Sequence, residues 1–486
     1  MVDATSPLSL QIRSLLKRPL ITCLMTDTIA TASRAMTAQG GTSIIVLDPD
    51  GQPRGIITDR DLRERVLAVG RSPAEPVMAI MTTPLVSVSP EAFVLEAVVE
   101  MARHGIHHLL VVEGGRLLGL VTSDDLLRVE ATQPLELVRA IQASTSFDDL
   151  ATRVPDLTAV VRQLVDQGLS GYEIGRIVSE VNDQLIRRTL GFAEEGLRDE
   201  GFAAPPVAFC WLALGSEGRR EQTLRTDQDN GLVYEDPPAG MGNAAQRYFL
   251  AFAERAIEGL VRLGYPRCRG GSMASNPRWC QPLSVWRGYF EDWARDTTPE
   301  HLMYASIYLD FRPVAGEARL ARDLRDEVRA RVTTWRSFPR YLAKIAVSHA
   351  PPLGLFGRFK CQRSNGRRGV NVKLGGMLLL NNALRAYAIE LGLDETNTIE
   401  RLEAAARVGR CFTEGETDEI RAAYETIFRL RLRHQLAQLD AGQEPDNFLD
   451  PYALGRADQR RLRDAFRAIH HLQGKVEDRY FTQILN

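Results

Sequence analysis

The sequence predicts an α+β protein of several domains, and three observations support this fold class. The chain has 486 residues, which is enough for about three domains of ordinary size. Its first 130 residues contain an internal duplication in which strand-like runs alternate with helical periodicity. A central stretch of strands and helices with acidic residues then gives way to long helical patterns from about residue 380 onward.

The composition is that of a soluble globular protein, with 44% hydrophobic residues, 25% charged residues and a formal net charge of −2. This balance predicts neither a nucleic-acid partner nor a membrane partner. The N-terminus lacks the apolar segment of a signal peptide, and the longest apolar run, around 207–214, is too short to span a bilayer. Six dispersed cysteines without a C-x-x-C pair indicate reduced thiols. We therefore expect a cytoplasmic protein.

The duplication is visible when "GIITDRDL" (55–62) is aligned with "GLVTSDDL" (119–126), at an offset of 64 residues. Upstream, "ATASRAMTAQG" (30–40) matches "LEAVVEMARHG" (95–105). Each unit reads as helix, strand, turn, strand and helix, and two such units would share one core.

This tandem, over residues 15–130, resembles a CBS-domain pair, a module that commonly binds adenosine nucleotides between its repeats. The resemblance implies an adenosine nucleotide as effector and a homodimer formed through the pair. A carboxylate can accept hydrogen bonds from both ribose hydroxyls, while a threonine can contact a phosphate or the sugar. Alternatively, the threonine and the aspartate of each repeat only cap the helix that follows the strand. The two motifs are Gly55, Thr58 and Asp61 in the first repeat and Gly119, Thr122 and Asp125 in the second.

The sequence of residues 131–204 predicts a helical connector. Apolar residues such as Ile174, Ile177 and Val181 recur at helical spacing, and the expected role is that of a structural spacer. Pro205 and Pro206 stop any helix and mark the boundary to the next domain.

The segment "LALGSEGRREQTLRTDQDNGLV" (212–233) places two aspartates one residue apart. We expect a strand over 207–214, a turn at Gly215-Ser216, a polar helix-like segment, and a second strand that carries Asp227 and Asp229. Strand alternation would send both carboxylates to one face, with Cα atoms roughly 6.6 to 6.8 Å apart. Their repulsion predicts a cation between them.

This pattern resembles the nucleotidyltransferase superfamily that includes DNA polymerase β, and it is most similar to the bacterial PII uridylyltransferases and a related CBS-linked group. The resemblance implies a central mixed sheet with helices, over 205–335, in which Asp227 and Asp229 bind Mg²⁺ or Mn²⁺. A glycine lets the backbone approach a phosphate, and a serine at a helix start can donate a hydrogen bond to it. The implied phosphate contacts are therefore Gly215, Ser216 and Arg219.

A third carboxylate is expected from "MYASIYLDFRPVAGE" (303–317). Its apolar residues alternate with polar ones, which predicts a strand with Asp310 on its polar face. The resemblance also selects Asp310 as the third metal ligand. The alternative is an ion pair with Arg312 or a cap at the strand end.

The C-terminal part, 336–486, is predicted to form a helical bundle. Its segment "GVNVKLGGMLLL" resembles a uridylyltransferase segment, and Lys373 could therefore contact the β- or γ-phosphate. Five basic residues between 358 and 368 have no acidic residue among them. This run is either a solvated loop or a contact for a phosphate or an acidic partner.

These patterns support two hypotheses. The first is a Mg²⁺-dependent nucleotidyltransferase that moves an NMP from an NTP to an unknown acceptor, possibly a protein, under control of an adenine nucleotide bound to the CBS pair. The second is a catalytically inactive sensor or scaffold of the same fold. No His-Asp pair occurs in the chain, so the hydrolase activity of the bifunctional PII-modifying enzymes is not expected.

Overall fold

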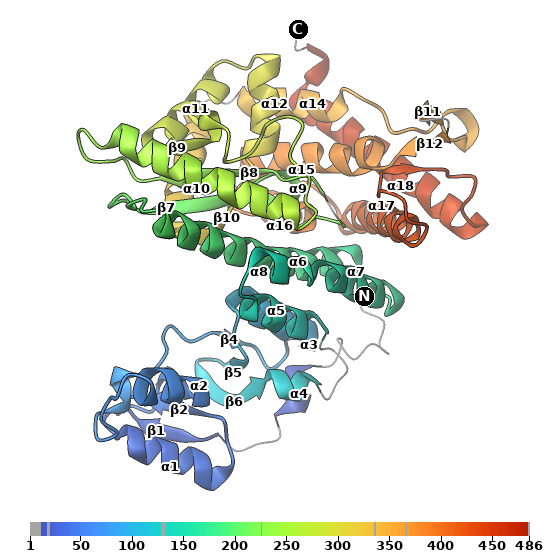
Figure 1. Ribbon diagram of the computed structural model, residues 1–486. Helices are drawn as coiled ribbons and strands as arrows, with labels where there is room; N and C mark the ends of the chain where they lie inside the picture. The colour runs from blue at the N-terminus through green and yellow to red at the C-terminus, as the bar shows by residue number, and fades with distance from the viewer. Residues whose placement is uncertain are drawn as a thin grey trace. The chain divides into compact units, whose positions relative to one another are not determined.

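The computed structural model describes residues 11–16, 20–127, 133–224, 226–334, 337–364 and 367–484. The chain forms two compact units, Met1–Arg139 and Ala140–Asn486, drawn from blue to teal and from green to red in Figure 1. The predicted domain limits at 130/131 and 335/336 lie outside the described residues. The division at residue 204 stays a prediction.

The first unit contains two repeats of the same architecture. Each repeat forms a three-stranded sheet in which the first pairing is parallel and the second antiparallel. The register repeats as well, because Val46 pairs with Gly55 and Val111 pairs with Gly119. The elements are β1 (Thr22–Leu24), α1 (Ile29–Gln39), β2 (Ser43–Leu47), β3 (Pro53–Thr58) and α2 (Asp59–Leu62), then β4 (Ser87–Val88), α3 (Val94–His104), β5 (His108–Glu113), β6 (Arg116–Thr122) and α4 (Ser123–Leu127). The predicted duplication is confirmed, with one short unpredicted strand before each long helix.

Local sequence signals set the limits of α1. The Thr28 side chain accepts a hydrogen bond from the Thr31 N–H at the start, and Gly40 ends the helix in the left-handed region at a φ of 62°. The face that carries Ile29 and Met36 is buried against the apolar side of β2 and β3. Each such side chain removed from water contributes about 1.5–3 kcal/mol.

Four helices follow between residues 133 and 199, as predicted for this region, and the first of them crosses the division between the two units. They are α5 (Gln133–Ala143), α6 (Phe147–Ala151), α7 (Val154–Asp166) and α8 (Gly171–Asp199). A capping box between Ser170 and Glu173 starts α8. The expectation that this region is only a spacer is wrong for α8, because α8 buries Glu180 and Asp183 and packs against the central sheet and α10.

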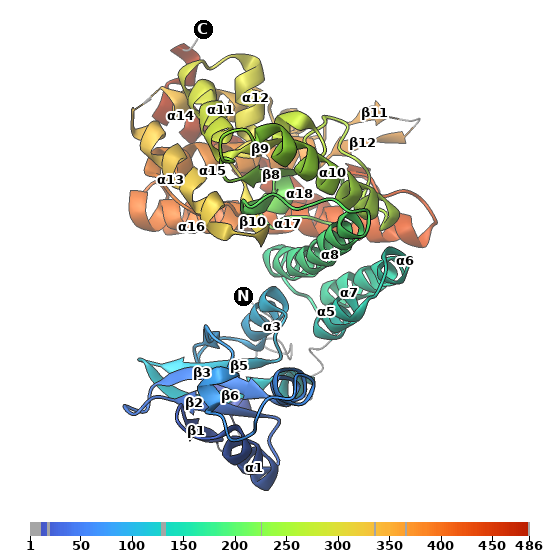
Figure 2. The ribbon, with the colours of Figure 1, turned by 60° about the vertical axis from the view of Figure 1, so that its left-hand side comes forward.

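A four-stranded mixed sheet forms the centre of the second unit (Figures 1 and 2). Its order is β10-β7-β8-β9, and β7 is antiparallel to both neighbours, whereas β9 is parallel to β8. Leu212 and Leu232 are almost fully buried in it. The elements here are β7 (Phe209–Ala213), α9 (Gly215–Gly218), β8 (Asn230–Tyr234), α10 (Gly242–Arg262), β9 (Cys280–Pro282), α11 (Leu283–Arg295), α12 (Pro299–Tyr308), β10 (Arg312–Gly316) and α13 (Ala318–Thr334).

The predicted strand around Asp310 is wrong in its first half. Thr298 caps a helix that begins at Pro299 and runs to Tyr308, so the strand starts only at Arg312. The alternation of apolar residues in this helix serves aromatic packing, since the ring centroids of Tyr308 and Trp279 lie 4.1 Å apart. Asp310 consequently lies in the connection between α12 and β10.

The C-terminal part is mainly helical, as predicted, but it includes a small unpredicted sheet with the strand order β11-β12-β13. No helix in the described part of the chain has the length and apolarity that a membrane crossing requires. The elements are α14 (Phe338–Val347), η6 (Leu355–Gly357), β11 (Gln362–Ser364), β12 (Arg367–Asn371), η7 (Lys373–Met377), α15 (Leu378–Leu391), α16 (Thr398–Gly409), α17 (Glu414–Asp440), β13 (Phe448–Leu449) and α18 (Arg456–Tyr480).

Candidate functional site

The turn after β7 brings a glycine and an aspartate together. Gly215 has a φ of 55°, and a Cβ atom at this position would lie 2.8 Å from Oδ2 of Asp229. The Leu214 N–H donates to the carbonyl of Asp229 across 3.0 Å, which joins the two segments just beyond the paired strands. Only glycine fits both the backbone conformation and the close approach. Ser216 follows as a half-buried residue in the first turn of α9.

Asp227 and Asp229 lie close together, as predicted, although both precede β8 instead of lying on it. Ligand atoms of Asp227, Asp229 and Cys268 all lie within 4.8 Å of one another. Burial first, and then the charge of Asp227, raises the pKa of Asp229 to about 6. The carboxylate oxygens fit Mg²⁺ or Mn²⁺, which prefer oxygen ligands. The Cys268 thiol, whose pKa is raised mainly by burial, does not.

Lys373, at the start of η7, lies within the electrostatic range of both aspartates. Burial lowers the pKa of its ammonium group, the charge of Arg431 lowers it further, and Asp227 and Asp229 raise it. The C-terminal part therefore brings a cation to the two carboxylates, and the phosphate contact of Lys373 stays a prediction.

Arg431, on α17, is a second cation at this site, and sequence reasoning missed it. The residue is buried, and this burial lowers the pKa of its guanidinium to about 10, while Tyr424, Glu221 and Asp227 raise it. Its Nε donates to Oδ1 of Asn447 across 2.5 Å, which fixes the side chain. It lies in a 27-residue helix with many other charged residues, so no local pattern distinguishes it.

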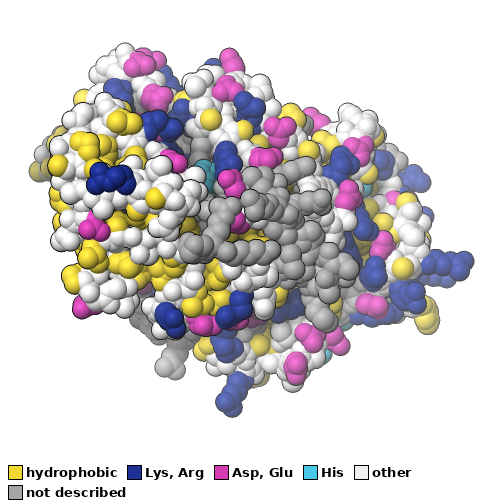
Figure 3. Space-filling view, turned by 90° about the horizontal axis from the view of Figure 1, so that it is seen from below, with side chains coloured by type: hydrophobic (Ala, Val, Ile, Leu, Met, Phe, Trp, Pro, Cys, Tyr) yellow, Lys and Arg dark blue, Asp and Glu magenta, His cyan; other side chains and the backbone are white. Residues whose placement is uncertain are grey.

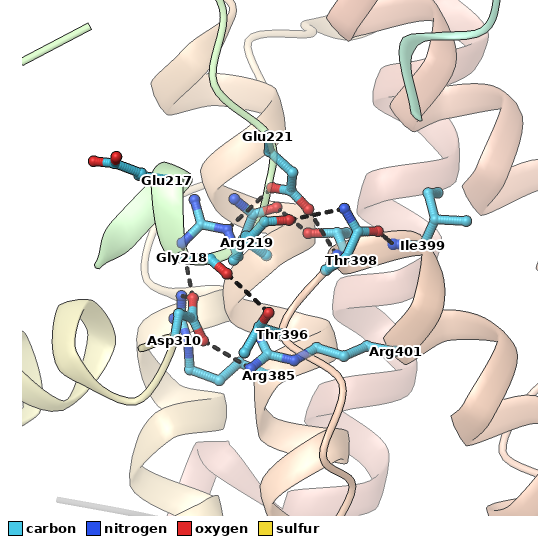
Figure 4. Close-up of polar contacts among 12 residues, drawn as sticks. Glu217, Gly218, Arg219, Glu221, Asp310, Arg385, Thr396, Thr398, Ile399 and Arg401 are labelled. Atoms are coloured by element: carbon cyan, nitrogen blue, oxygen red, sulfur yellow. Dashed lines mark hydrogen bonds and ion pairs between the residues drawn. The ribbon is translucent and has the colours of Figure 1, made fainter. Parts of the chain in front are cut away.

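Asp310 does not join this site. Its fully buried carboxylate accepts hydrogen bonds from three arginines, at 2.8 Å from Arg219, 2.6 and 3.0 Å from Arg385 and 2.7 Å from Arg401 (Figure 4). These guanidinium groups outweigh the cost of burial and hold the pKa of Asp310 far below its usual range. The prediction of a third metal ligand is therefore corrected, because its oxygens are already occupied. The alternative pairing with Arg312 is also wrong.

The prediction that Arg219 contacts a phosphate is likewise corrected, because its guanidinium already binds two carboxylates. Its Nε donates to Glu221 across 3.0 Å and its Nη1 to Asp310 across 2.8 Å. Glu221 also accepts a hydrogen bond of 2.6 Å from the Thr398 N–H at the start of α16. This buried network, drawn in Figure 4, connects the central sheet to α15 and α16.

A second buried ion pair connects α8 to β10. Both terminal nitrogens of Arg312 donate to the Asp183 carboxylate, at 2.6 and 2.8 Å. Close to this pair lies Glu217, whose side chain points away from the arginines of Figure 4 and lines a small cavity together with Asp227. Burial, together with the charges of Asp183 and Asp229 and against that of Arg312, raises the pKa of Glu217 to about 8.

The predicted ribose-binding residues of the first unit form helix caps. Oγ1 of Thr58 donates to Asp61 across 2.7 Å, and Oγ1 of Thr122 donates to Asp125 across 2.6 Å. The Thr58 and Thr122 N–H groups also donate to these carboxylates, each across 2.9 Å. The capping alternative thus describes their contacts in this structure, and nucleotide binding stays a prediction.

The two glycines of these motifs have a packing reason of their own. A Cβ atom at Gly55 would lie 2.6 Å from Sδ of Met81, and one at Gly119 would lie 2.5 Å from Cδ2 of Leu16. Glycine at these positions therefore follows from the close approach of neighbouring side chains.

Family models match most of the chain. Residues 12–68 and 77–132 match the model described as "CBS domain", residues 155–300 match "Putative nucleotidyltransferase DUF294", and residues 336–480 match "Putative nucleotidyltransferase substrate binding domain". The chain belongs to the CBS-linked DUF294 nucleotidyltransferase family. In this family member, Asp227 and Asp229 lie within the nucleotidyltransferase match, whereas Lys373 and Arg431 come from the substrate-binding match.

Three individual relatives each match a quarter of this DUF294 protein or less. It is similar to the uncharacterized protein MK0525 of Methanopyrus kandleri, with 35% identity over 25% of this chain and 63% of that protein. It is also similar to the CBS domain-containing protein YhcV of Bacillus subtilis, with 36% identity over 21% of this chain and 79% of that protein. The chain spans 61% of a third relative, the mitochondrial CBSX3 of Arabidopsis thaliana, at 31% identity. It thus spans less than two thirds of the first and third relatives.

Among solved structures, this DUF294 protein is similar to the CBS domain protein PAE2072 of Pyrobaculum aerophilum complexed with AMP. The identity is 26%, the TM-score is 0.24, and the similarity covers 25% of this chain and all of that one. A CBS-domain protein from Burkholderia ambifaria gives 31% identity and a TM-score of 0.24, over 24% of this chain and 92% of that one.

The residues that this DUF294 protein adds to the predicted set share one property. Glu217, Arg385, Arg401 and Arg431 are charged side chains on or beside helices and are buried by contacts between distant segments. A buried charge is recognisable only from its partners, and these partners lie far away in the sequence. The "GSEGRRE" segment was the one available signal, since Glu217 and Glu221 flank the turn at the site.

Proposed function

We propose that this protein is a nucleotidyltransferase that moves an NMP from an NTP to an acceptor, at the site formed by Gly215, Ser216, Asp227, Asp229 and Lys373. The observation that carries the proposal is the close approach of the Gly215 turn to Asp229. It brings the first residue of α9 into contact with one carboxylate of the pair. A phosphate bound at the turn would meet a cation held by that pair.

Asp227 and Asp229 would hold Mg²⁺ or Mn²⁺, and the chemistry that this ion supplies is electrostatic stabilisation of the transferred phosphoryl group and of pyrophosphate. The chain's own residues position the substrate. Lys373 and Arg431 carry positive charge toward the carboxylates, so the β- and γ-phosphates would lie between them and the Gly215 turn. In this arrangement Arg431 takes the role that the sequence suggested for Arg219.

The CBS pair would regulate this activity by binding an adenosine nucleotide. In support, the Asp61 and Asp125 carboxylates occupy equivalent positions in the two repeats. Each lies in the first turn of the helix that follows an antiparallel strand pair. A homodimer through this module is part of the proposal, and light scattering of the full chain tests it.

A second function is favoured by one observation, namely that three arginines hold Asp310, so that the site keeps two carboxylates and a thiol. A site with fewer metal ligands could bind nucleotide without turnover. The protein would then act as a nucleotide-dependent sensor or scaffold.

The decisive experiment compares wild type with Asp229→Asn. We expect the variant to keep the fold, to lose Mg²⁺-dependent NTP binding in calorimetry, and to abolish transfer of label from α-labelled NTP. Asp199→Asn is the matched control, since Asp199 is an exposed aspartate at the end of α8. Metal-dependent binding without transfer to any acceptor, pyrophosphate exchange included, would favour the scaffold. An unchanged Mg²⁺ response in Asp229→Asn would contradict the assignment of the site.

A further inference from the structure

One surface of the second unit carries positive charge that no described acidic residue balances. Arg358, Lys360, Arg363 and Arg368 are exposed, and none of them forms an ion pair with any residue in the described ranges. A fifth basic residue, Arg367, is paired with Asp446 at 2.6 Å. We call the four unpaired cations together with Phe356 the hairpin surface.

The hairpin surface is built by an ordered fold of the backbone. The Gly354 N–H donates to the Arg358 carbonyl across 2.7 Å, and the Lys360 N–H donates to the Pro352 carbonyl across 3.0 Å, which closes the loop. Its tip is attached to α18, because Nε of Arg463 donates to the Gly357 carbonyl across 3.0 Å. The backbone here is thus fixed by hydrogen bonds, and both alternatives that the sequence left open stay open.

Two cations of the hairpin surface lie directly opposite each other, and their repulsion destabilises the strand pair. Arg363 and Arg368 are directly paired in the antiparallel ladder of β11 and β12, and like charges at such positions destabilise a strand pair. The Arg368 guanidinium also lies 5.8 Å from the ring centroid of Tyr452. An anion bound between the two arginines would turn this repulsion into attraction.

Phe356 presents its ring to solvent in a conformation that packing does not explain. The side chain is 99% exposed, and its φ of 58° is unfavourable for a bulky residue. An exposed aromatic ring two residues before an unpaired arginine is the combination that stacks on a base while the cation contacts a phosphate.

The surface adjoins the candidate site through η7. A Cβ atom at Gly375 would lie 2.7 Å from Cδ of Pro352, so the loop packs directly on the segment that carries Lys373. Figures 1 and 2 both show β11 and β12 at the edge of the second unit. Figure 3, seen from below, shows Lys and Arg side chains along its right-hand edge, interspersed with Asp and Glu side chains.

We propose that the hairpin surface binds single-stranded nucleic acid. Arginine predominates among its cations, and the arginine fork matches phosphate geometry. The ring of Phe356 adds a contact that an acidic protein chain would not use, because acidic side chains have no face to stack on it. The net charge of −2 predicted no such partner, but a sum over the chain hides an unbalanced local surface. This inference does not depend on nucleotide transfer.

The test is fluorescence anisotropy of the full chain with a fluorescein-labelled RNA of about 12 nucleotides, titrated from about 50 to 200 mM salt. Four phosphate contacts predict a slope of log K against log salt of about −2.8. Phe356→Ala should weaken binding about fivefold or more and leave this slope unchanged. Replacing the four cations together by alanine should remove measurable binding. The four are Arg358, Lys360, Arg363 and Arg368.

The matched control removes the same charge elsewhere on the second unit and should leave the affinity within about twofold. It replaces by alanine four exposed arginines of α10, α11, α13 and α16, namely Arg247, Arg287, Arg322 and Arg407. If this control variant lost as much RNA affinity as the hairpin variant, the proposal would be overturned. Competition by polyglutamate as strong as by unlabelled RNA, with no effect of Phe356→Ala, would also overturn it and indicate an acidic-protein surface. Asp229→Asn should bind RNA like wild type, which separates this test from that of the transferase.

Discussion

Nη1 of Arg219 lies 2.8 Å from Oδ2 of the fully buried Asp310, and two further arginines complete this buried cluster. The sequence had suggested these two residues for phosphate and metal, whereas the structure uses them to join the central sheet to the C-terminal helices. The distinction between structural and functional charges can be tested residue by residue.

Asp310→Asn should destabilise the protein strongly and leave metal binding nearly unchanged in the fraction that folds. Removing one partner of a buried charge network costs about 3–5 kcal/mol, because the remaining guanidinium groups stay buried without compensation. Urea unfolding measures the stability, with the exposed Asp418→Asn on α17 as the control. If the variant is stable but no longer binds Mg²⁺, Asp310 is a metal ligand after all.

Arg431→Gln and Lys373→Ala should each weaken NTP binding about tenfold or more, because each removes a cation near the proposed phosphate position. Arg433→Gln is the control on the same helix, where the side chain is half exposed. Arg219→Gln should instead reduce the melting temperature more than the affinity in calorimetry. Wild-type affinity in Arg431→Gln would remove this residue from the site.

Gly215→Ala should reduce stability by about 1–2 kcal/mol and weaken Mg²⁺-dependent binding together. The added Cβ would meet Asp229 Oδ2 at 2.8 Å, in a backbone conformation that alanine disfavours. Gly242→Ala, at the start of α10, has open space around the new atom and should be neutral or slightly stabilising. Denaturation and calorimetry on both variants would show whether the turn and the carboxylate are coupled.

The stability of the metal-free protein should fall as the pH rises from about 4.5 to about 8, in part because of Glu217. Its pKa is raised to about 8 in the fold, so the folded state holds a proton that the unfolded chain has already released. The groups that face it are Arg312, Asp183 and Asp229.

Glu217→Gln removes this ionisation and should therefore gain about 2–4 kcal/mol over wild type at pH 8, with no gain near pH 4.5. Urea unfolding across this pH range measures the difference, and the exposed Glu444→Gln serves as the control. A constant difference at all pH values would mean that Glu217 is ionised throughout.

Thr58→Ala should cost about 1 kcal/mol, because Thr58 caps α2, and it should also weaken binding of an adenosine nucleotide. Thr28→Ala removes a similar cap from α1 and should cost as much without affecting the nucleotide. Calorimetry of the full chain with AMP, ADP and ATP distinguishes the two residues. No heat from any of the three nucleotides with wild type would leave capping as the only role of the motif.

The sequence by itself determined those features that depend on neighbouring residues. The duplication, the long helices, the Gly215 turn and the pair Asp227 and Asp229 follow from periodicity, turn chemistry and short spacing, all of which act within a few residues. The segment 299–308 shows the limit of such patterns, because a helix cap and a proline at its start outweighed the apparent strand alternation beyond it.

Only the tertiary structure decided which charges work in the site and which hold the fold. Asp310 and Asp229 are both acidic residues near strands. Three arginines converge on Asp310, one directly after α9 and two from the C-terminal helices. A glycine turn, Asp227 and Lys373 surround Asp229. The physical reason is that the pKa and the availability of a buried carboxylate depend on desolvation and on charges within a few ångströms. Arg401 lies 91 residues from Asp310 in the sequence, and Lys373 lies 144 residues (373 − 229) from Asp229.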